Sequence, residues 1–170
     1  MAFRLAVQSD LANLQTVFKE LIKEMAQNKV DIWDDIYPIA YFEEDIAKKQ
    51  LYVLTENNEI LAALALTDTD PGENQVTWQD PKAKALYLTR FGVNPHYHHQ
   101  GIGSRMLQEA IRVTRERQIP YLRLFVVDIN QPAIQLYQKN GFNQVQGIYN
   151  EVIDEELTLK EYGYEINTFF

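Results

Sequence analysis

The sequence predicts a mixed α/β fold, in which helices cover a sheet that combines antiparallel hairpins with parallel crossovers. Two observations predict it. Paired apolar runs that resemble hairpins occur in both halves of the chain, and between them an amphipathic helical segment separates two strand-like runs. The chain has 170 residues and no linker, internal repeat or low-complexity tract. We therefore expect a single domain spanning residues 1–170.

The first third of the chain predicts five elements. Apolar side chains recur every three to four residues between Leu11 and Met25, which indicates an amphipathic helix that Ser9 can cap at its start. Two apolar runs on either side of the polar turn 56–59 indicate a hairpin. In order, the elements are a strand at Phe3–Val7, helices at 11–25 and 39–49, and strands at Leu51–Thr55 and Ile60–Leu66.

The rest of the chain predicts six elements after a long polar loop at Thr67–Lys82. Gly92 lies inside a predicted strand, where glycine typically marks a bulge or a close backbone approach. The run Tyr121–Val127 is apolar almost throughout, as expected of a buried parallel strand. Asn130 is a candidate helix cap and Gly141 a candidate helix stop. In order, the elements are a strand at Ala85–Val93, a helix at Ile102–Gln118, a strand at Tyr121–Val127, a helix at 130–140, and strands at Val145–Tyr149 and Glu155–Tyr162.

Composition and charge argue against several classes of protein. Sixteen basic and 24 acidic residues give a net charge of −8, so we expect no broad nucleic-acid surface. The absence of cysteine excludes disulfides, a thiolate nucleophile and zinc–thiolate sites. No apolar run approaches the roughly 18 residues of a membrane span, and the N-terminus does not resemble a signal peptide. We expect a cytoplasmic protein with no membrane partner.

The strongest functional signal is the segment Val93-Asn94-Pro95-His96-Tyr97-His98-His99-Gln100-Gly101-Ile102-Gly103-Ser104. It lies between a predicted strand and a predicted helix, and its two glycines allow a tight turn. Free N–H groups at a helix start, with the helix dipole behind them, suit a phosphate or pyrophosphate. A turn that binds nothing is the alternative. A Walker loop does not match, because Ser104 follows Gly103 directly, and Met106 stands where a dinucleotide fingerprint needs a third small residue.

The segment His98-x-x-Gly101-x-Gly103 resembles the pyrophosphate loop of the GNAT superfamily of acyl-CoA-dependent N-acetyltransferases. Residues Asn130 to Phe142, with Ala133, Tyr137 and Gly141, resemble that family's second motif. The resemblance implies a mixed, mostly antiparallel sheet of about seven strands flanked by about four helices, with a splayed central strand pair. In the family, Arg or Gln usually stands where this chain has His98, which would contact a diphosphate best when protonated.

The resemblance also implies acetyl-CoA as co-substrate and a set of residues that bind it. Main-chain N–H groups of the turn would hold the pyrophosphate, and the strand end would hold the pantetheine arm. Tyr137 is expected to be the general acid for the departing thiolate, with packing in the core as the alternative. Asn130 either contacts pantetheine or simply caps its helix. The expected binding residues are Phe91, Gly92, Val93, His98, His99, Gln100, Gly101, Ile102, Gly103, Ser104, Asn130 and Tyr137.

The expected reaction is transfer of an acetyl group to a primary amine of a small molecule or protein by direct attack. Two alternatives remain open: a non-catalytic acyl-CoA-binding sensor or interaction module, and a structural protein that has lost the cofactor. We expect a monomer or a homodimer. Edge strands near the C-terminus would pair in the homodimer.

The residues of the acceptor side are the least defined. Four acids that flank the family's acceptor site are candidate general bases, although exposed acids are usually only solvated. They are Glu43, Glu44, Glu151 and Asp154. Two groups of aromatic residues either line an acceptor pocket or pack in the core. They are Trp33, Tyr37, Tyr41 and Phe42 near one end of the chain, and Tyr149, Tyr162 and Tyr164 near the other. We expect no metal site at His96, His98 and His99, because their spacing in a turn points them apart.

Overall fold

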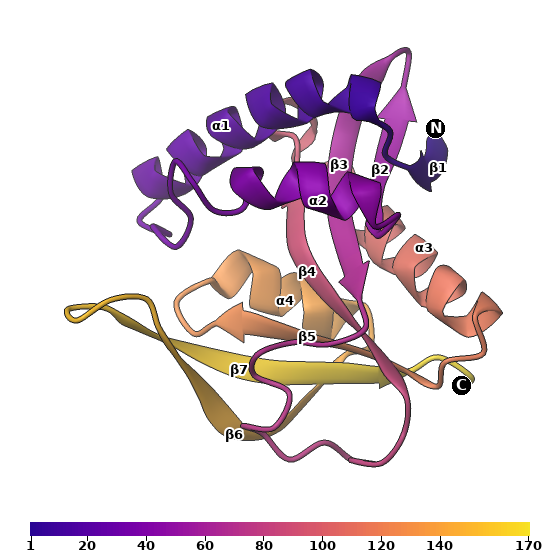
Figure 1. The fold of residues 1–170 in the computed structure, drawn as a ribbon, viewed down its shortest axis with the longest axis vertical. Coiled ribbons are helices and arrows are strands. Elements are labelled where there is room, and N and C mark those ends of the chain that lie inside the picture. Colours follow the sequence, from indigo (N-terminus) through magenta and orange to yellow (C-terminus); the bar gives the residue numbers. More distant parts are fainter. The chain divides into compact units, whose positions relative to one another are not determined.

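The computed structural model describes all 170 residues and contains seven strands and four α-helices (Figure 1). The strands are β1 (Ala2–Leu5), β2 (Leu51–Glu56), β3 (Glu59–Thr67), β4 (Ala85–Val93), β5 (Tyr121–Val127), β6 (Asn143–Val152) and β7 (Thr158–Asn167). The helices are α1 (Leu11–Gln27), α2 (Phe42–Ala47), α3 (Ile102–Glu116) and α4 (Gln131–Lys139). Hydrogen bonding orders the strands β1-β2-β3-β4-β5-β7-β6. Strands β4 and β5 run parallel, whereas β1–β2, β2–β3, β5–β7 and β6–β7 are antiparallel, which confirms the predicted fold class.

The chain forms two compact units. The N-terminal unit comprises Met1–Leu66 and Arg90–Glu109, and the C-terminal unit comprises Thr67–Thr89 and Ala110–Phe170. The boundaries fall within β3, β4 and α3, so each of these elements contributes residues to both units. The single domain inferred from the sequence remains a prediction.

In the N-terminal unit, α1 and α2 cover one face of the β2–β3 hairpin (Figure 1). The hairpin turns through two asparagines, Asn57 and Asn58, whose φ values of 52° and 65° suit the tight turns that match strand twist. Phe18 of α1 is fully buried, with the rings of Phe42 and Trp33 centred 4.8 and 5.7 Å away. Phe42 and Trp33 therefore pack in the core. This is the second of the two roles that the sequence left open for them, the first being to line an acceptor pocket.

Helix α1 begins differently from the prediction. Ser9 makes no cap, because residues Gln8–Asp10 form a 3-10 turn and the helix starts after Asp10. The Asp10 carboxylate accepts hydrogen bonds from the Val7 N–H (2.8 Å) and from both terminal nitrogens of Arg4 (2.8 and 3.0 Å). The bonds from Arg4 lower the pKa of Asp10. An ion pair from β1 thus organises this turn, and sequence-local capping rules do not include it.

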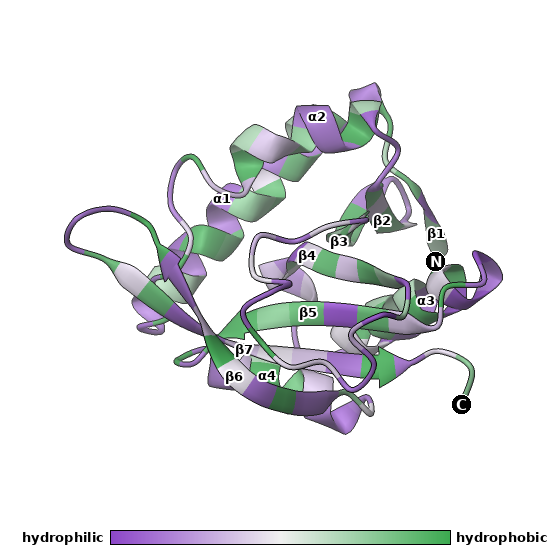
Figure 2. Cartoon of the chain, turned by 60° about the horizontal axis from the view of Figure 1, so that its bottom comes forward, coloured by the Kyte–Doolittle hydropathy of each residue, from purple (hydrophilic) through white to green (hydrophobic).

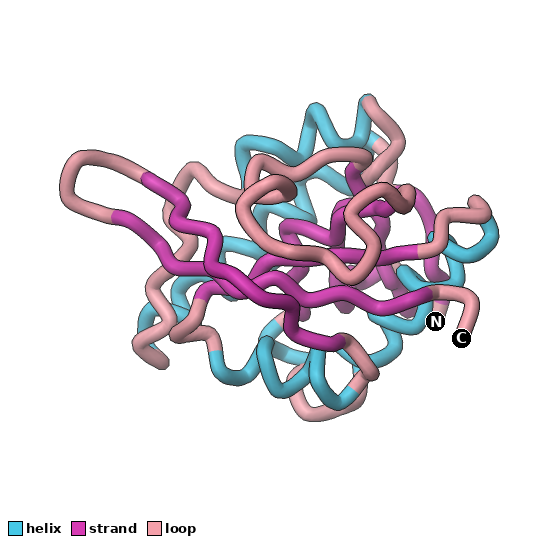
Figure 3. Tube along the Cα trace, turned by 90° about the horizontal axis from the view of Figure 1, so that it is seen from below, coloured by secondary structure: helices cyan, strands magenta, loops and turns pink.

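In the C-terminal unit, the four strands carry different structures on their two faces. Helix α4 covers one face, where the Tyr137 ring lies 6.4 Å from that of Tyr164 on β7. The loop 68–84 covers the other face, where Trp78 meets Phe125 of β5 at 5.5 Å (Figure 3). Side chains of successive strand residues point to opposite faces of a sheet. Phe125 lies opposite Gly163, so it shares a face with Gly163, whereas the next residue, Tyr164, lies on the face that α4 covers.

The hairpin of β6 and β7 is longer than predicted, and Glu155 lies in its turn rather than in a strand. The turn is built on Asp154, whose Oδ1 accepts the N–H groups of Glu156 (2.8 Å) and Leu157 (2.9 Å). Most of β6 is exposed, so it lacks the apolar alternation that predicts strand ends. Figure 3 shows this turn projecting from the unit.

Hydropathy follows burial in the C-terminal unit. Figure 2 shows β5 as mainly hydrophobic, with one hydrophilic interruption. Arg123 is the only charged residue of this strand, and it is almost fully buried. None of the helices combines the length and the apolar character needed to cross a membrane.

Candidate active site

The end of β4 is held in place by Asn94 in the N-terminal unit. The main-chain N–H of this buried residue donates to the Leu61 carbonyl (2.8 Å), and its side-chain amide donates to the Ile60 carbonyl (2.9 Å). Its side-chain oxygen accepts the N–H of His96 at 3.0 Å. One buried amide therefore ends the strand and starts the turn that precedes α3.

The turn before α3 exposes main chain to solvent. His99 and Gly101 have φ values of +61° and +77°, and no heavy atom lies within 4 Å of where a Gly101 β-carbon would be. The first helical hydrogen bond joins the Arg105 N–H to the Gly101 carbonyl at 3.0 Å. The N–H groups of Ile102 and Gly103 precede this bond at the positive end of the helix dipole. The turn thus fits the demands of a diphosphate.

The His98 side chain is braced within the N-terminal unit. Its Nδ1 lies 2.9 Å from Glu24 Oε1 of α1, and its Nε2 lies 3.2 Å from the Val93 carbonyl oxygen. Both partners are oxygen atoms, so the ring is held by one contact on each side. His98 thereby ties α1 to the end of β4. A direct contact with the cofactor through this side chain remains a prediction.

The histidines of this turn do not converge. The Nε2 atom of His96 lies 3.1 Å from Glu20 Oε2, and the rings of His98 and His99 stand nearly perpendicular with centroids 6.3 Å apart. No group of three His, Cys, Asp or Glu side chains in the described chain, residues 1–170, is placed to hold a metal ion. The cluster of three histidines in the sequence is thus three separate side chains in the fold.

Gly92 serves helix packing, and the irregularity of β4 lies two residues earlier. A β-carbon on Gly92 would meet Leu21 at 2.5 Å and Phe18 at 2.8 Å, so glycine lets α1 approach the strand. Arg90 has a φ of 51°, the left-handed conformation that interrupts an extended strand. The sequence allowed either a bulge or a close approach at Gly92, and the contact with α1 matches the close approach.

Arg90 and Asp45 form a buried ion pair that the sequence did not suggest. Arg90 Nε and Nη2 lie 2.6 and 2.7 Å from the two oxygens of Asp45, which also accepts Gln50 Nε2 at 2.7 Å. The guanidinium stacks 5.1 Å from the Tyr41 ring. Burial opposes the charge of Arg90, but the bonds and charge of Asp45 outweigh it and raise the pKa of Arg90. This pair holds the irregular residue of β4 against α2.

The acids of α2 make poor general bases. Glu43 is exposed, and Glu44 forms an ion pair with Lys48 at 2.7 Å. The hydrogen bond from Lys48 lowers the pKa of Glu44, which weakens it as a proton acceptor. Asp154 is committed to the turn between β6 and β7. Glu151, the fourth acid proposed from the sequence, hydrogen-bonds Glu161 of β7.

Tyr137 lies in the core of the C-terminal unit. It is 6% exposed, and its ring centre is 5.9 Å from that of Phe142 and 6.4 Å from that of Tyr164. Burial raises the pKa of Tyr137 well above its usual value, so the phenol stays protonated. The Asn130 side chain accepts the Ala133 N–H at 3.4 Å, which confirms its predicted role as the N-cap of α4.

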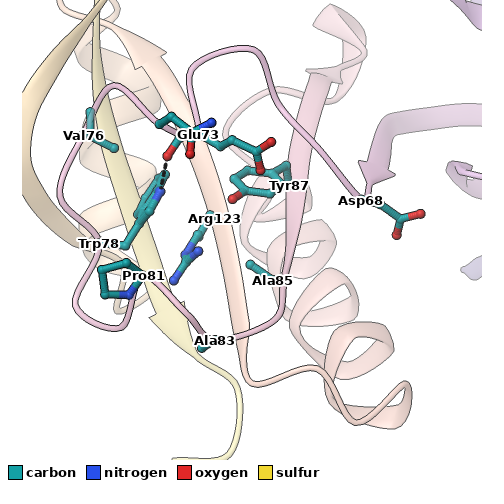
Figure 4. A pocket seen from close by; sticks show the side chains of 10 residues that line it. Asp68, Glu73, Val76, Trp78, Pro81, Ala83, Ala85, Tyr87 and Arg123 are labelled. Carbon is teal, nitrogen blue, oxygen red and sulfur yellow. Dashed lines mark hydrogen bonds between the residues drawn. The ribbon is translucent and has the colours of Figure 1, made fainter.

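A cavity of about 400 Å³ lies under the loop 68–84 in the C-terminal unit (Figure 4). Arg123 reaches into its wall, with Nε 3.2 Å from Glu165 Oε1 and Nη2 2.8 Å from the Asp80 carbonyl. Its guanidinium stacks 4.6 Å from the Trp78 ring, and the Trp78 indole N–H donates to the Glu73 carbonyl at 2.8 Å. These contacts fix the loop onto the sheet, and Glu165 balances the charge of Arg123.

An acidic group lies on the same face, further along β7. Glu161 is 8% exposed and lies opposite Tyr149 in the register of β6 and β7. Burial, with hydrogen bonding to Glu151 and its charge, raises the pKa of Glu161 to about 10. Burial and the neighbouring acids also raise the pKa of Tyr149 to about 12. Sequence reasoning named Glu151 and missed Glu161, although their positions in one hairpin were a usable signal.

Comparisons with known proteins agree with this arrangement. The model of the Acetyltransferase (GNAT) family matches residues 16–142. A thialysine N-epsilon-acetyltransferase of Bos taurus is 37% identical over 65 residues, which span 38% of this chain and only 36% of the bovine enzyme. The YwnH protein of Bacillus subtilis, named provisionally as a phosphinothricin acetyltransferase, is 24% identical over 148 residues, 84% of this chain and 83% of YwnH.

Solved structures share the fold. A GNAT-family acetyltransferase of Streptococcus agalactiae superposes with a TM-score of 0.83 at 17% identity, covering 98% of this chain and 94% of that one. The yncA protein of Salmonella typhimurium, solved with its cofactor acetyl-CoA, has a TM-score of 0.67 at 16% identity, covering 98% and 93% of the two chains. From the family match over residues 16–142, the chain belongs to the Acetyltransferase (GNAT) family.

Proposed function

We propose that the protein is an N-acetyltransferase that moves the acetyl group of acetyl-CoA to a primary amine by direct attack of the amine on the thioester. The observation that carries the proposal is the turn before α3. Its left-handed residues His99 and Gly101, and the N–H groups at the start of the helix, offer a main-chain anion site. The family match over residues 16–142 supports the same reaction class.

We propose that cofactor binding divides between the turn and the end of β4. The main-chain N–H groups from His99 to Ser104 would hold the diphosphate, and Phe91–Val93 would hydrogen-bond the pantetheine arm. His98 supports this role because its contacts with Glu24 and Val93 fix its ring beside the turn. The expected splaying of β4 from β5 belongs to this proposal; the β4–β5 ladder of the C-terminal unit runs from Ala85 to Leu88.

Tyr137 is our proposed general acid. Burial raises its pKa, which keeps the phenol protonated but makes it a weaker acid, so the proposed role rests on its place in the family's second motif. A main-chain N–H of the β4 end would stabilise charge on the thioester oxygen, a contribution of about 3 kcal/mol where such donors have been removed from other enzymes. The amine must also lose a proton before or during attack.

Release of free CoA thiol from acetyl-CoA, measured with a panel of primary amines, tests the proposal. A rate that depends on the amine supports an enzyme. Binding of CoA without thiol release would instead support the non-catalytic acyl-CoA-binding module. If CoA at about 100 times its dissociation constant stabilises the fold by roughly 2.7 kcal/mol, the cofactor binds the native state. Absence of any thermal shift with CoA would contradict both the enzyme and the acyl-CoA-binding module.

Three further proposals concern domain organisation, location in the cell and oligomeric state. We propose that residues 1–170 act as one acetyltransferase domain, that the protein works in the cytoplasm, and that it is a monomer or homodimer. The acceptor is a small-molecule or peptide amine. Size-exclusion chromatography with light scattering measures the oligomeric state.

A further inference from the structure

The acidic group of the C-terminal unit has an unsatisfied buried atom. Glu161 is 8% exposed, and its Oε2 has no hydrogen-bond partner. A buried polar atom without a partner costs about 1–3 kcal/mol, so native structures rarely keep one without a purpose. The atom belongs to a carboxyl group that also hydrogen-bonds another acid, Glu151.

Two of the elements that face Glu161, strand β6 and the loop 68–84, place acidic groups beside it. From β6 come Glu151 and Tyr149, the latter directly opposite Glu161 in the strand register. From the loop 68–84 comes Asp70, whose charge also acts on both Glu161 and Tyr149. Val127 of β5, the partner of Glu161 on its other side, is apolar. Three carboxyl groups and a phenol thus influence one another in this part of the C-terminal unit.

The loop is held over this group by close packing. A β-carbon on Gly72 would lie 2.5–2.9 Å from atoms of the Tyr149 ring, so glycine lets the loop rest on that ring. Asp70 Oδ1 accepts the Gly72 N–H at 2.9 Å, which fixes the carboxylate beside it. Asp70 and Glu151 are half-buried while Glu161 is buried, so the acids lead from solvent to the unsatisfied oxygen.

We propose that Glu161, Glu151, Asp70 and Tyr149 form a binding site for an organic cation, the primary ammonium group of the acetyl acceptor. The inference rests on the proposed function for the identity of the cation as acceptor, but the site itself does not. An ammonium ion brings three donors to a place rich in acceptor oxygens, among them the unpartnered Oε2 of Glu161, and Tyr149 adds an aromatic face. A metal ion is the wrong occupant, since no three such side chains are placed to coordinate one.

Binding of an ammonium ion beside Glu161 is expected to displace the proton of its carboxyl group. Because the pKa of Glu161 is raised to about 10, its carboxyl group holds a proton at pH 7.5 before the cation arrives. When the ammonium binds, the O–H bond of Glu161 breaks, its electrons stay on the carboxylate and the proton passes to solvent. The ammonium then takes the place of the proton. Binding therefore releases up to one proton per cation, which is a signature that a simple surface contact lacks.

The experiment uses the full chain and 1,5-diaminopentane as probe, with uncharged 1,5-pentanediol as the matched control ligand. Calorimetry at pH 7.5 in buffers of different ionisation enthalpy measures both affinity and proton release. We expect the diamine to bind at least tenfold more tightly than the diol, with proton release. Glu161→Gln should weaken the diamine at least tenfold and abolish the proton release, and Glu151→Gln should weaken it as well. Glu156→Gln, which removes an exposed acid from the same hairpin, should change neither.

Equal binding of diamine and diol by the native protein would overturn the inference, and so would unchanged diamine binding by folded Glu161→Gln. If that variant fails to fold, Glu151→Gln and the ligand comparison decide. Acetyl-CoA binding, measured on the same samples, separates the two proposals. Tight acetyl-CoA binding with no preference for the diamine removes the cation site and leaves the acetyltransferase. Diamine binding without any acetyl-CoA binding removes the proposed function and leaves the site as a cation site.

Discussion

Two buried acids, one in each unit, differ in how their charge is balanced. In the N-terminal unit, Asp45 receives three hydrogen bonds, from Arg90 and Gln50, so both of its oxygens are satisfied. In the C-terminal unit, Glu161 faces other acids, and its Oε2 is left without a partner. Both residues are more than 90% buried.

The difference separates a structural charge from a functional one. A buried acid that is fully paired holds its element in place, as Asp45 does for the left-handed residue of β4. A buried acid among like charges costs stability unless something outside the chain completes it. Comparison of the two sites therefore predicts opposite responses to removal of the acid.

The largest expected effect is at the balanced site. Asp45→Ala leaves Arg90 buried without its partner, and loss of one member of a buried pair typically costs about 3–5 kcal/mol of unfolding free energy. Urea denaturation measures the change. Glu43→Ala, an exposed acid on the same helix, is the matched control and should alter stability very little. A cost below about 1 kcal/mol for Asp45→Ala would show that the pair does not hold the strand.

The next effect is at the unbalanced site and depends on pH. Below pH 4.5, the ordinary pKa, Glu161 is protonated in both the folded and the unfolded chain. As pH rises toward 10 the unfolded chain loses this proton and the folded chain retains it, so the stabilising contribution is progressively lost. Glu161→Gln stays neutral and avoids this loss. We expect its stability relative to the native protein to increase steadily, by up to about 5 kcal/mol, between pH 5 and pH 9.

Thermal unfolding of Glu161→Gln and the native protein across that pH range measures the difference. Glu156→Gln serves as control and should follow the native curve. A constant difference between Glu161→Gln and the native protein at all pH values would mean that Glu161 is ionised in the fold, contrary to our account.

The smallest effect extends the comparison to an exposed pair. Glu44 and Lys48 lie 2.7 Å apart on the surface of α2, where solvent and salt screen their attraction. The bond from Lys48 lowers the pKa of Glu44, so this pair adds stability only above the ordinary pKa of the acid and loses it as pH falls. Glu44→Gln should leave the melting temperature at pH 7 almost unchanged. A drop comparable to that of Asp45→Ala would contradict the role we assign to burial.

These sites also show what the sequence could predict. The turn from His98 to Ser104 was predictable because its chemistry depends on main-chain N–H groups and two glycines that are close in the sequence. The element order was predictable for a similar reason, since apolar periodicity is local. The choice between a bulge and a close approach at Gly92 was not local, because it depends on Phe18 and Leu21 of a helix distant in the sequence.

Side-chain pairs between distant segments were beyond reach. Arg90 and Asp45 are 45 residues apart, and nothing local marks either as buried. Capping rules point to Ser9 because they consider only residues next to the helix start. The Arg4–Asp10 ion pair, which organises this turn, is outside those rules. Glu151 was named without Glu161, because only the strand register brings Tyr149 opposite Glu161.

The central claim is that the turn before α3 binds the diphosphate of acetyl-CoA through its main chain. Calorimetric titration of the native protein with acetyl-CoA and with S-acetylpantetheine, which lacks the diphosphate and the nucleotide, tests it most directly. We expect acetyl-CoA to bind at least tenfold more tightly, and this advantage to shrink in Gly101→Val, since a β-branched residue resists the left-handed conformation at that position. Equal affinity for the two ligands, or no binding of acetyl-CoA, would contradict the account.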